Sequence, residues 1–325
     1  MYHSPSTLQA LLSQEKSKAY ATKNYLRDLN VQDIREPVNE SCRAKMVEWV
    51  SMLCDMCHLS RSVVPITFSY VDRMLSDATS NEETISVLQN RDKYQLMVIV
   101  SFYIAVKINE EKVLSPGILE RLSRGRYTVR DIETEEQRIL QALDWRLFGP
   151  NAFHFVHHLF YVISPAHLAS AANGNSPPAI DEIARRALVQ VEASLAEQSF
   201  LDYSYSDIAL AALQNTIDDI GHLYCPLQVW AANLEVCDIL VGVDAHSEEV
   251  ECIKDRLREI MVDCPGQSRK SPSICRDGNV PMASKAKEEE DKENTMAATT
   301  KPPIIKKTEI SSPTCVGRIT IESHM

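Results

Sequence analysis

The stretch KYQLMVIVSFYIAVKINEE, residues 93–111, decides the fold because it contains the longest apolar run of the chain. The run covers residues 94–108, which is short for a membrane span, since a helix needs about 20 predominantly apolar residues to cross a bilayer. It also carries the polar residues Gln95, Ser101 and Lys107. These features predict a helix buried in the middle of a domain.

Further helices are predicted on both sides of this run. Before Gly149-Pro150, apolar spacing predicts helices over 40–58, 64–75, 92–108, 115–123 and 129–145, with a loop over 76–92. A second set starts at Asn151 and ends near residue 261. We therefore predict an all-α protein with two tandem five-helix domains, 37–149 and 150–261. The extension 1–36 is predicted to carry an amphipathic helix over about residues 6–29.

The composition changes after residue 261. Segment 262–325 contains no Phe, Tyr or Trp, so it cannot build a core, and we predict that it is disordered. The first 261 residues contain 24 basic and 36 acidic side chains. Such an acidic region repels phosphate backbones, which disfavours nucleic-acid binding. The chain starts without a secretory signal and its 9 cysteines are scattered, so we expect reduced thiols.

Four charged residues lie among apolar neighbours in the predicted helices: Arg43, Asp72, Lys107 and Glu136. Burying an unpaired charge is costly, so each needs a partner or a position at a rim. From spacing alone, solvated surface is the simpler interpretation. Lys107 would then be a cation at a helix C-terminus, and Glu136 one member of an acidic cluster.

Four segments resemble, in order, the successive helices of the cyclin box. They are CRAKMVEWV (42–50), FSYVDRML (68–75), KYQLMVIVSFYIAVKINEE (93–111) and DIETEEQRILQALDWRL (131–147). Arg43, Asp72, Leu96, Lys107 and Glu136 occupy the most characteristic positions of the box. Arg43 and Asp72 are 29 residues apart, as are Lys107 and Glu136. The chain thus resembles a two-box cyclin, and the ending Trp145-Arg146-Leu147 is closer to D-type than to mitotic cyclins.

The resemblance implies a regulatory subunit, itself no enzyme, that binds and activates a cyclin-dependent protein kinase in cell-cycle control. It implies that Lys107 and Glu136 bind backbone groups of the kinase beside its αC helix, on a surface shared with Leu96 and Glu110. Arg43 and Asp72 are expected to form a structural ion pair. The alternative is a cyclin-fold adaptor or transcription-associated scaffold that does not activate a kinase.

A substrate-docking patch is a further expectation of the resemblance. Cys42, Met46 and Trp49 are spaced i, i+4, i+7 and therefore share one helix face. In cyclins this face is an exposed groove that binds Arg-x-Leu peptides. Here Cys42 and Met46 replace larger or stiffer apolar residues and Lys45 interrupts the pattern. The same three residues fit the edge of a core equally well.

Two short patterns resemble cofactor sites. CDMCH (54–58) matches the C-x-x-C-H of haem attachment, but Cys54 and Cys57 continue the inward stripe of their helix, which favours core packing. HFVHH (154–158) lacks an accompanying acid or thiolate for a metal. The sequence also lacks a glycine-rich phosphate loop and a nucleophile motif. We expect no cofactor, no metal and no catalytic site.

The tail contains one candidate recognition motif, Lys292-Glu293-Asn294, which resembles the KEN degron read by the ubiquitin ligase called the anaphase-promoting complex. Such a triplet also arises easily in a segment rich in Lys and Glu. Residues 301–307 are a short basic candidate for nuclear import. We expect the protein in nucleus and cytoplasm, with a kinase, Arg-x-Leu substrates and this ligase as candidate partners, and with neither nucleic acid nor membrane.

Overall fold

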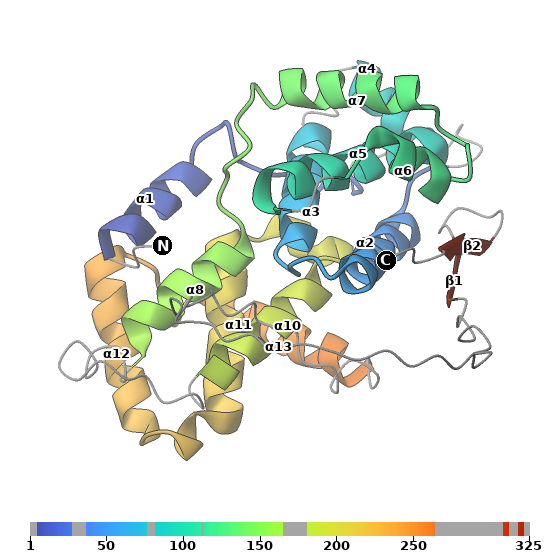
Figure 1. Ribbon diagram of the computed structural model, residues 1–325. Helices are drawn as coiled ribbons and strands as arrows, with labels where there is room; N and C mark the ends of the chain where they lie inside the picture. The colour runs from blue at the N-terminus through green and yellow to red at the C-terminus, as the bar shows by residue number, and fades with distance from the viewer. Residues whose placement is uncertain are drawn as a thin grey trace, which may run out of the picture.

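The computed structural model describes residues 5–27, 37–76, 82–111, 114–164, 181–263, 308–311 and 318–321. Its described part is helical as far as Asp263 (Figure 1). The all-α prediction is therefore confirmed.

The first set of helices packs around one buried helix, α5. The set comprises α2 (Glu40–Cys57), α3 (Val63–Leu75), α4 (Glu82–Leu88), α5 (Arg91–Asn109), α6 (Pro116–Leu122) and α7 (Val129–Ala142). Helix α5 is buried continuously from Met97 to Val106 and packs mainly against α3 and α7. This confirms the buried helix predicted from the apolar run. No helix in the described part of the chain is long and apolar enough to span a membrane.

Polar caps fix where the helices of the first set begin. The Asn39 side chain accepts a hydrogen bond from the Cys42 backbone N–H at the start of α2. Asn90 accepts from the first turn of α5 in the same way. Thr128 and Asp131 form a reciprocal capping box at the start of α7. These caps satisfy backbone donors that a helix leaves unpaired, and so they fix the register of the helices that carry the candidate site.

The second set packs around α11. It comprises α8 (Ala152–Ile163), α10 (Asp181–Ser194), η1 (Gln198–Asp202), α11 (Tyr205–Ile220), η2 (Gly221–Leu223), α12 (Leu227–Val241) and α13 (Glu248–Asp263). Helix α11 contacts α8, α10 and α13, and almost all of its apolar side chains are buried. Ser204 caps it by accepting from the Asp207 backbone N–H, 3.1 Å away.

The buried apolar side chains form two separate clusters, one centred on each set of helices, and the first also includes Leu195 and Leu201 from the second half of the chain. Helix α1 (Pro5–Glu15) joins the second cluster through Leu8 and Leu12. Figure 1 shows α1 beside α8 and α12, with which it makes contact. The N-terminal helix therefore packs with the second set of helices, although the first set follows it directly in the sequence. The exact domain bounds stay a prediction.

The linker after α7 is tied down by side chains from the N-terminal half. The Tyr70 hydroxyl donates to the Leu147 carbonyl at 2.9 Å, and Arg73 donates to the Arg146 carbonyl at 2.8 Å. Gly149, in the same linker, lies close to the ring of Tyr20. A Cβ atom on residue 149 would be 2.8 Å from that ring. The residue therefore has to be glycine unless Tyr20 moves.

The helix predicted over residues 6–29 is shorter in the structure, because α1 ends at Glu15. Leu8 and Leu12 lie in the second cluster, whereas Tyr25 lies in the first. The chain has to cross from one cluster to the other between them, and one straight helix cannot serve both.

Helix α4 occupies part of the stretch predicted as the loop 76–92. Its residues Thr84, Val87 and Leu88 are buried. A seven-residue helix is too short to show a periodic pattern, which explains why the sequence did not predict it.

Within the tail, the structure describes an antiparallel pair of strands, β1 (Thr308–Ser311) and β2 (Arg318–Ile321). The other tail residues beyond Asp263 lie outside the described residues, and so does the candidate degron Lys292, Glu293 and Asn294. The degron therefore stays a prediction.

Candidate functional site

A buried ion pair joins α2 to α3. The Arg43 guanidinium binds both carboxylate oxygens of Asp72, with Nη2 3.0 Å from Oδ2. The two side chains are only 2% and 3% exposed. A charge pair removed from water to this degree needs further hydrogen bonds to offset its desolvation.

Those further hydrogen bonds come from distant parts of the chain. The Tyr25 hydroxyl donates to Asp72 Oδ1 at 3.0 Å, and Arg43 Nε donates to the Leu195 carbonyl at 2.7 Å. Burial opposes the charge of Arg43, but Asp72 and Tyr25 offset it and raise the pKa of Arg43 well above its ordinary value. Because Leu195 follows α10, the pair holds the N-terminal segment, the first set and the second set together.

Lys107 and Glu136 also pair, but at the surface. Lys107 Nζ lies 2.9 Å from Glu136 Oε1, which joins the last turn of α5 to the middle of α7. The Lys107 side chain is 53% exposed and lies over the Tyr103 ring, whereas Glu136 is 15% exposed. The hydrogen bond to Glu136 raises the pKa of Lys107.

The other two predicted kinase-binding residues lie at opposite ends of α5. Glu110 caps its C-terminus, close in sequence to Lys107, and accepts a hydrogen bond from the Ser60 backbone N–H at 2.9 Å. Leu96 precedes Lys107 by eleven residues, which is about 16 Å along the helix at a rise of about 1.5 Å per residue. It is partly buried against the first cluster. The structure therefore groups Lys107, Glu136 and Glu110, but not Leu96.

The predicted docking patch is mostly covered. Met46 and Trp49 are each 2% exposed and belong to the first cluster, and Cys42 is half-buried against it. The burial favours the edge of the core over an exposed groove, because α2 turns this face toward the rest of the first set. Within the described part of the chain, the Trp49 indole N–H has no hydrogen-bond partner.

Side chains of both cofactor-like patterns pack inside the structure. Cys54 is buried in the first cluster and Cys57 packs against it, as the inward stripe predicted. His158 is buried in α8, and burial lowers the pKa of the neighbouring His154. In the described residues, no group of three His, Cys, Asp or Glu side chains could hold a metal ion.

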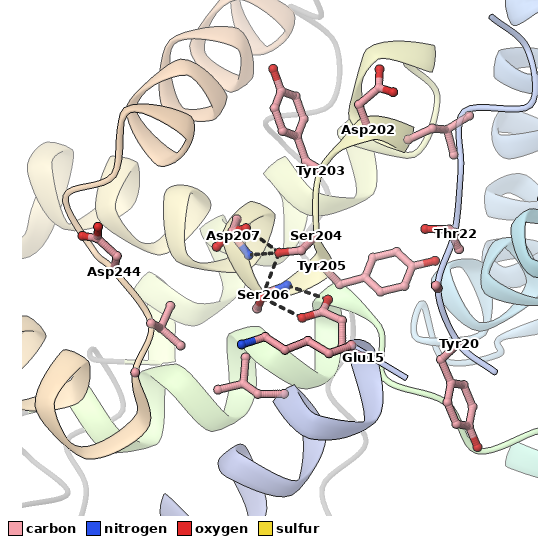
Figure 2. Close-up of a pocket in the computed structure, with 16 residues that line it drawn as sticks. Glu15, Tyr20, Thr22, Asp202, Tyr203, Ser204, Tyr205, Ser206, Asp207 and Asp244 are labelled. Atoms are coloured by element: carbon pink, nitrogen blue, oxygen red, sulfur yellow. Dashed lines mark hydrogen bonds between the residues drawn. The ribbon is translucent and has the colours of Figure 1, made fainter. Parts of the chain in front are cut away.

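A cavity of about 390 Å³ lies where the N-terminal segment meets the second set (Figure 2). Glu15 lies at one wall and accepts hydrogen bonds from the Ser206 backbone N–H, at 3.1 Å, and from its hydroxyl, at 2.7 Å. Burial raises the pKa of Glu15. The sequence pattern did not indicate this contact, because the two residues are 191 positions apart. The lining acids Glu15, Asp207 and Asp244 each accept a hydrogen bond from the protein itself, so the cavity is a junction between segments.

Comparison with known proteins shows which family this chain resembles in sequence. Residues 7–148 match the family model described as "Cyclin, N-terminal domain". G1/S-specific cyclin-E of Drosophila melanogaster is 21% identical over 241 residues, which is 74% of this chain and 29% of that protein. G2/mitotic-specific cyclin-1 of Medicago sativa subsp. varia is 27% identical over 176 residues, which is 54% of this chain and 36% of that protein.

The X-ray structure of a viral cyclin from herpesvirus saimiri matches with a TM-score of 0.56 and 20% identity, over 78% of this chain and 97% of that chain. Two helical sets, each packed around a buried central helix, therefore define an all-α protein of the cyclin fold. Residues 7–148 thus form a domain of the cyclin family, and the similarity to cyclins extends over most of the chain. It spans about a third of the length of the two curated relatives, which are E-type and mitotic. The predicted D-type character stays a prediction.

Proposed function

We propose that the chain is a non-catalytic regulatory subunit that binds and activates a cyclin-dependent protein kinase in cell-cycle control. Membership of the cyclin family supports the class of protein. The observation that carries the proposal is the Lys107–Glu136 pair, which lies at the surface where α5 and α7 meet.

The pair retains hydrogen-bonding groups for a partner. An ammonium group has three donors, and Lys107 uses one of them on Glu136 Oε1. Among the described residues, no hydrogen bond engages Glu136 Oε2, so this oxygen can accept one from a partner. A partner backbone offers both C=O and N–H groups, so a helix end of the kinase can bind both side chains. Both side chains lie on helices that pack against each other, and α5 is buried from Met97 to Val106, so the core supports their positions.

Activation follows from a difference in affinity. A protein kinase transfers phosphoryl groups only when its αC glutamate pairs with a lysine of the kinase's own β3 strand and its Mg²⁺-binding aspartate is in place. A subunit that binds this arrangement more tightly than the inactive one shifts the kinase population toward it. To move the ratio from 1:99 to 99:1, the affinities must differ about 10⁴-fold.

The test uses reversed charges. We expect Lys107→Glu and Glu136→Lys each to weaken binding to a kinase that co-purifies with the chain by about tenfold or more. Each substitution exchanges a donor for an acceptor, or the reverse, opposite the kinase backbone. The double variant restores an internal pair with its charges exchanged. If the pair serves only the cyclin's own stability, the double variant recovers activation. If it binds the kinase, the double variant stays inactive.

The matched control is Arg186→Glu with Glu182→Arg, a pair on the surface of α10. It should leave kinase binding unchanged, and circular dichroism should show the same helical content for all variants. Normal activation by Lys107→Glu would refute the assigned surface. A kinase that binds the wild-type chain without gaining activity would favour the cyclin-fold adaptor.

The remaining expectations belong to the same proposal. We propose that the protein acts in nucleus and cytoplasm and that Lys292, Glu293 and Asn294 direct its turnover by the anaphase-promoting complex. Docking of Arg-x-Leu peptides would require movement of the side chains that now bury Met46 and Trp49.

A further inference from the structure

The turn between α6 and α7 concentrates arginine side chains at the surface. It lies in RLSRGRYTVR, residues 121–130, and its arginines Arg121, Arg124, Arg126 and Arg130 are all exposed. We call these four residues the arginine turn. Between residues 119 and 131 the only acids are Glu120 and Asp131, so this segment is positive in a region that is otherwise strongly acidic.

Three of the four guanidinium groups lack an acidic partner. Arg126 pairs with Asp92, but within the described residues Arg121, Arg124 and Arg130 make no ion pair. Most exposed arginines elsewhere in the structure do have one. Examples are Arg27 with Asp202, Arg146 with Asp144, Arg186 with Glu182 and Arg258 with Asp218.

The nearest acids neutralise the arginine turn only in part: the pKa of Asp131 is lowered mainly by its hydrogen bonds from Thr128, and the charge of Arg130 contributes to the same shift. Asp131 is occupied in the capping box, where its carboxylate accepts from the Thr128 backbone N–H at 2.9 Å and from the Thr128 hydroxyl at 2.7 Å. Glu120 makes no ion pair with any arginine of the turn within the described residues. The N-terminal end of α7 adds a partial positive charge beside Arg130. The surface therefore favours an anionic ligand.

The backbone of the turn is held in one conformation. Arg124 and Gly125 both have positive φ angles, 56° and 73°, and the Gly125 N–H donates to the Glu120 carbonyl at 2.8 Å. The Tyr127 hydroxyl donates to Gln95 of the buried helix α5, 2.8 Å away. A left-handed non-glycine residue is costly and persists only where its surroundings fix it. The arginines thus project from a rigid support, which lowers the entropy lost on binding.

We propose that the arginine turn binds a phosphorylated serine or threonine in a peptide segment of a partner protein. A guanidinium binds two oxygens of one phosphate in a planar fork, and clusters of arginine are a recurrent means of recognising phosphopeptides. A peptide with one phosphate fits better than a nucleic acid, because the acidic remainder of the ordered region repels an extended polyanion. The binding itself does not depend on a kinase. Its use in selecting substrates that are already phosphorylated rests on the proposed function.

The experiment measures retention of the purified full chain on bead-bound degenerate peptide libraries. Three libraries differ only at a fixed central position, which is phosphoserine, serine or glutamate. We expect retention on the phosphoserine library alone. Retention of the variant R121A/R124A/R130A should be at least about tenfold lower, because the three guanidinium groups without an ion pair are removed.

The matched control is R185A/R186A, which removes two arginines from the surface of α10. We expect the phosphoserine beads to retain this variant as well as they retain the wild type. Thermal unfolding verifies that all variants are folded. Equal retention on the serine or glutamate library, no retention on any library, or an unaffected triple variant would each overturn the proposal. So would tighter binding of a single-stranded oligouridine through the same arginines, which would indicate a nucleic-acid surface. Normal kinase activation by the triple variant, with loss of peptide retention, separates this proposal from the previous one.

Discussion

Arg43 holds three segments together with one side chain. Its Nε binds the Leu195 carbonyl, and its Nη groups bind Tyr25 and Asp72. The guanidinium also lies over the Phe68 ring, 5.1 Å from its centre. A buried ion pair is weak evidence for net stability, because desolvation offsets much of its attraction. Removing one partner is a different matter, since it leaves the other charge buried and unpaired.

We therefore expect Arg43→Ala to lower the free energy of unfolding by about 3–5 kcal/mol, measured by urea denaturation. The control is Arg185→Ala, whose partner Glu182 is at the surface, and it should cost about 1 kcal/mol or less. The double variant R43A/D72A should be more stable than R43A, because Asp72 is no longer left without its counter-charge. Equal costs for Arg43→Ala and the control would contradict a buried pair.

The raised pKa of Glu15 leads us to expect that the stability of the protein depends on pH. Burial raises its pKa above the ordinary value of 4.5, so the folded state binds the proton more tightly than the unfolded state. The stability that protonation contributes is therefore present at low pH and is lost as pH rises from about 4.5 through the raised pKa. The neighbouring charge of Asp207 acts in the same direction, while Ser206 opposes it.

Glu15→Gln removes this titration while its amide oxygen can still accept from Ser206. We expect the wild type to lose stability relative to Glu15→Gln as pH increases above about 4.5. Denaturation at a series of pH values measures the difference. A constant difference across that range would show that Glu15 has the same pKa in both states.

At the scale of elements, the sequence predicted helices wherever an apolar pattern was long. Helices α2, α3, α5, α6 and α7 all lie within three residues of their predicted bounds, because their caps and apolar stripes are local signals. Helix α4 is too short to show a period. Helix α1 ends early because Glu15 and Tyr25 contact different halves of the molecule, and tertiary contacts of that kind leave no local pattern.

The candidate site was also predictable only in part, since the sequence indicated one ion pair but not the distant residues that bind it. The resemblance indicated that Arg43 pairs with Asp72, and the structure shows the pair. The spacing could not show that Tyr25 and Leu195 complete the network, since Leu195 is 152 residues from Arg43. Nor could it show that Lys107 pairs with Glu136 inside the chain, because the angle between α5 and α7 determines that distance.

Helix α1 depends on its packing against the second set. Leu8 is 0% exposed within the second cluster, whereas Leu11 only packs against its edge. We expect Leu8→Ala to lower the free energy of unfolding by about 2–5 kcal/mol, because it leaves a cavity. Leu11→Ala, with the same loss of volume, should cost clearly less. Similar costs in urea denaturation would indicate that α1 is not docked.

At the scale of the molecule, the two sets are joined by a polar seam. Glu192 of α10 accepts from Ser51 of α2 at 2.8 Å and pairs with Arg61, which also binds Asp55 at 2.7 Å. Nearby, Glu40 accepts from the Gln198 backbone N–H at 2.9 Å. Burial raises the pKa of Glu192, and Arg61 opposes the shift. Charged contacts of this kind hold one relative orientation of the two sets, because each needs a defined geometry.

Arg61→Ala should therefore loosen the seam. We expect a loss of about 1.5–3 kcal/mol, the range for hydrogen bonds to charged groups. Without Arg61, the pKa of Glu192 rises further, so the deficit relative to the wild type should grow as pH increases above the ordinary glutamate range. In scanning calorimetry, the two sets should begin to unfold separately. A single unchanged transition would show that the apolar contacts alone couple them.

The docking of α1 on α8 and α12 also bears on how the chain is made. Helix α1 precedes both of its partners in the chain, so its binding surface is complete only after α12, which ends at Val241, has emerged from the ribosome. Leu8 and Leu12 therefore stay incompletely covered until then, while the chain grows at about 5–20 residues per second. Helix α1 is consequently among the later helices of this chain to reach its final packing, and chaperones that recognise nascent apolar segments can bind it in the meantime.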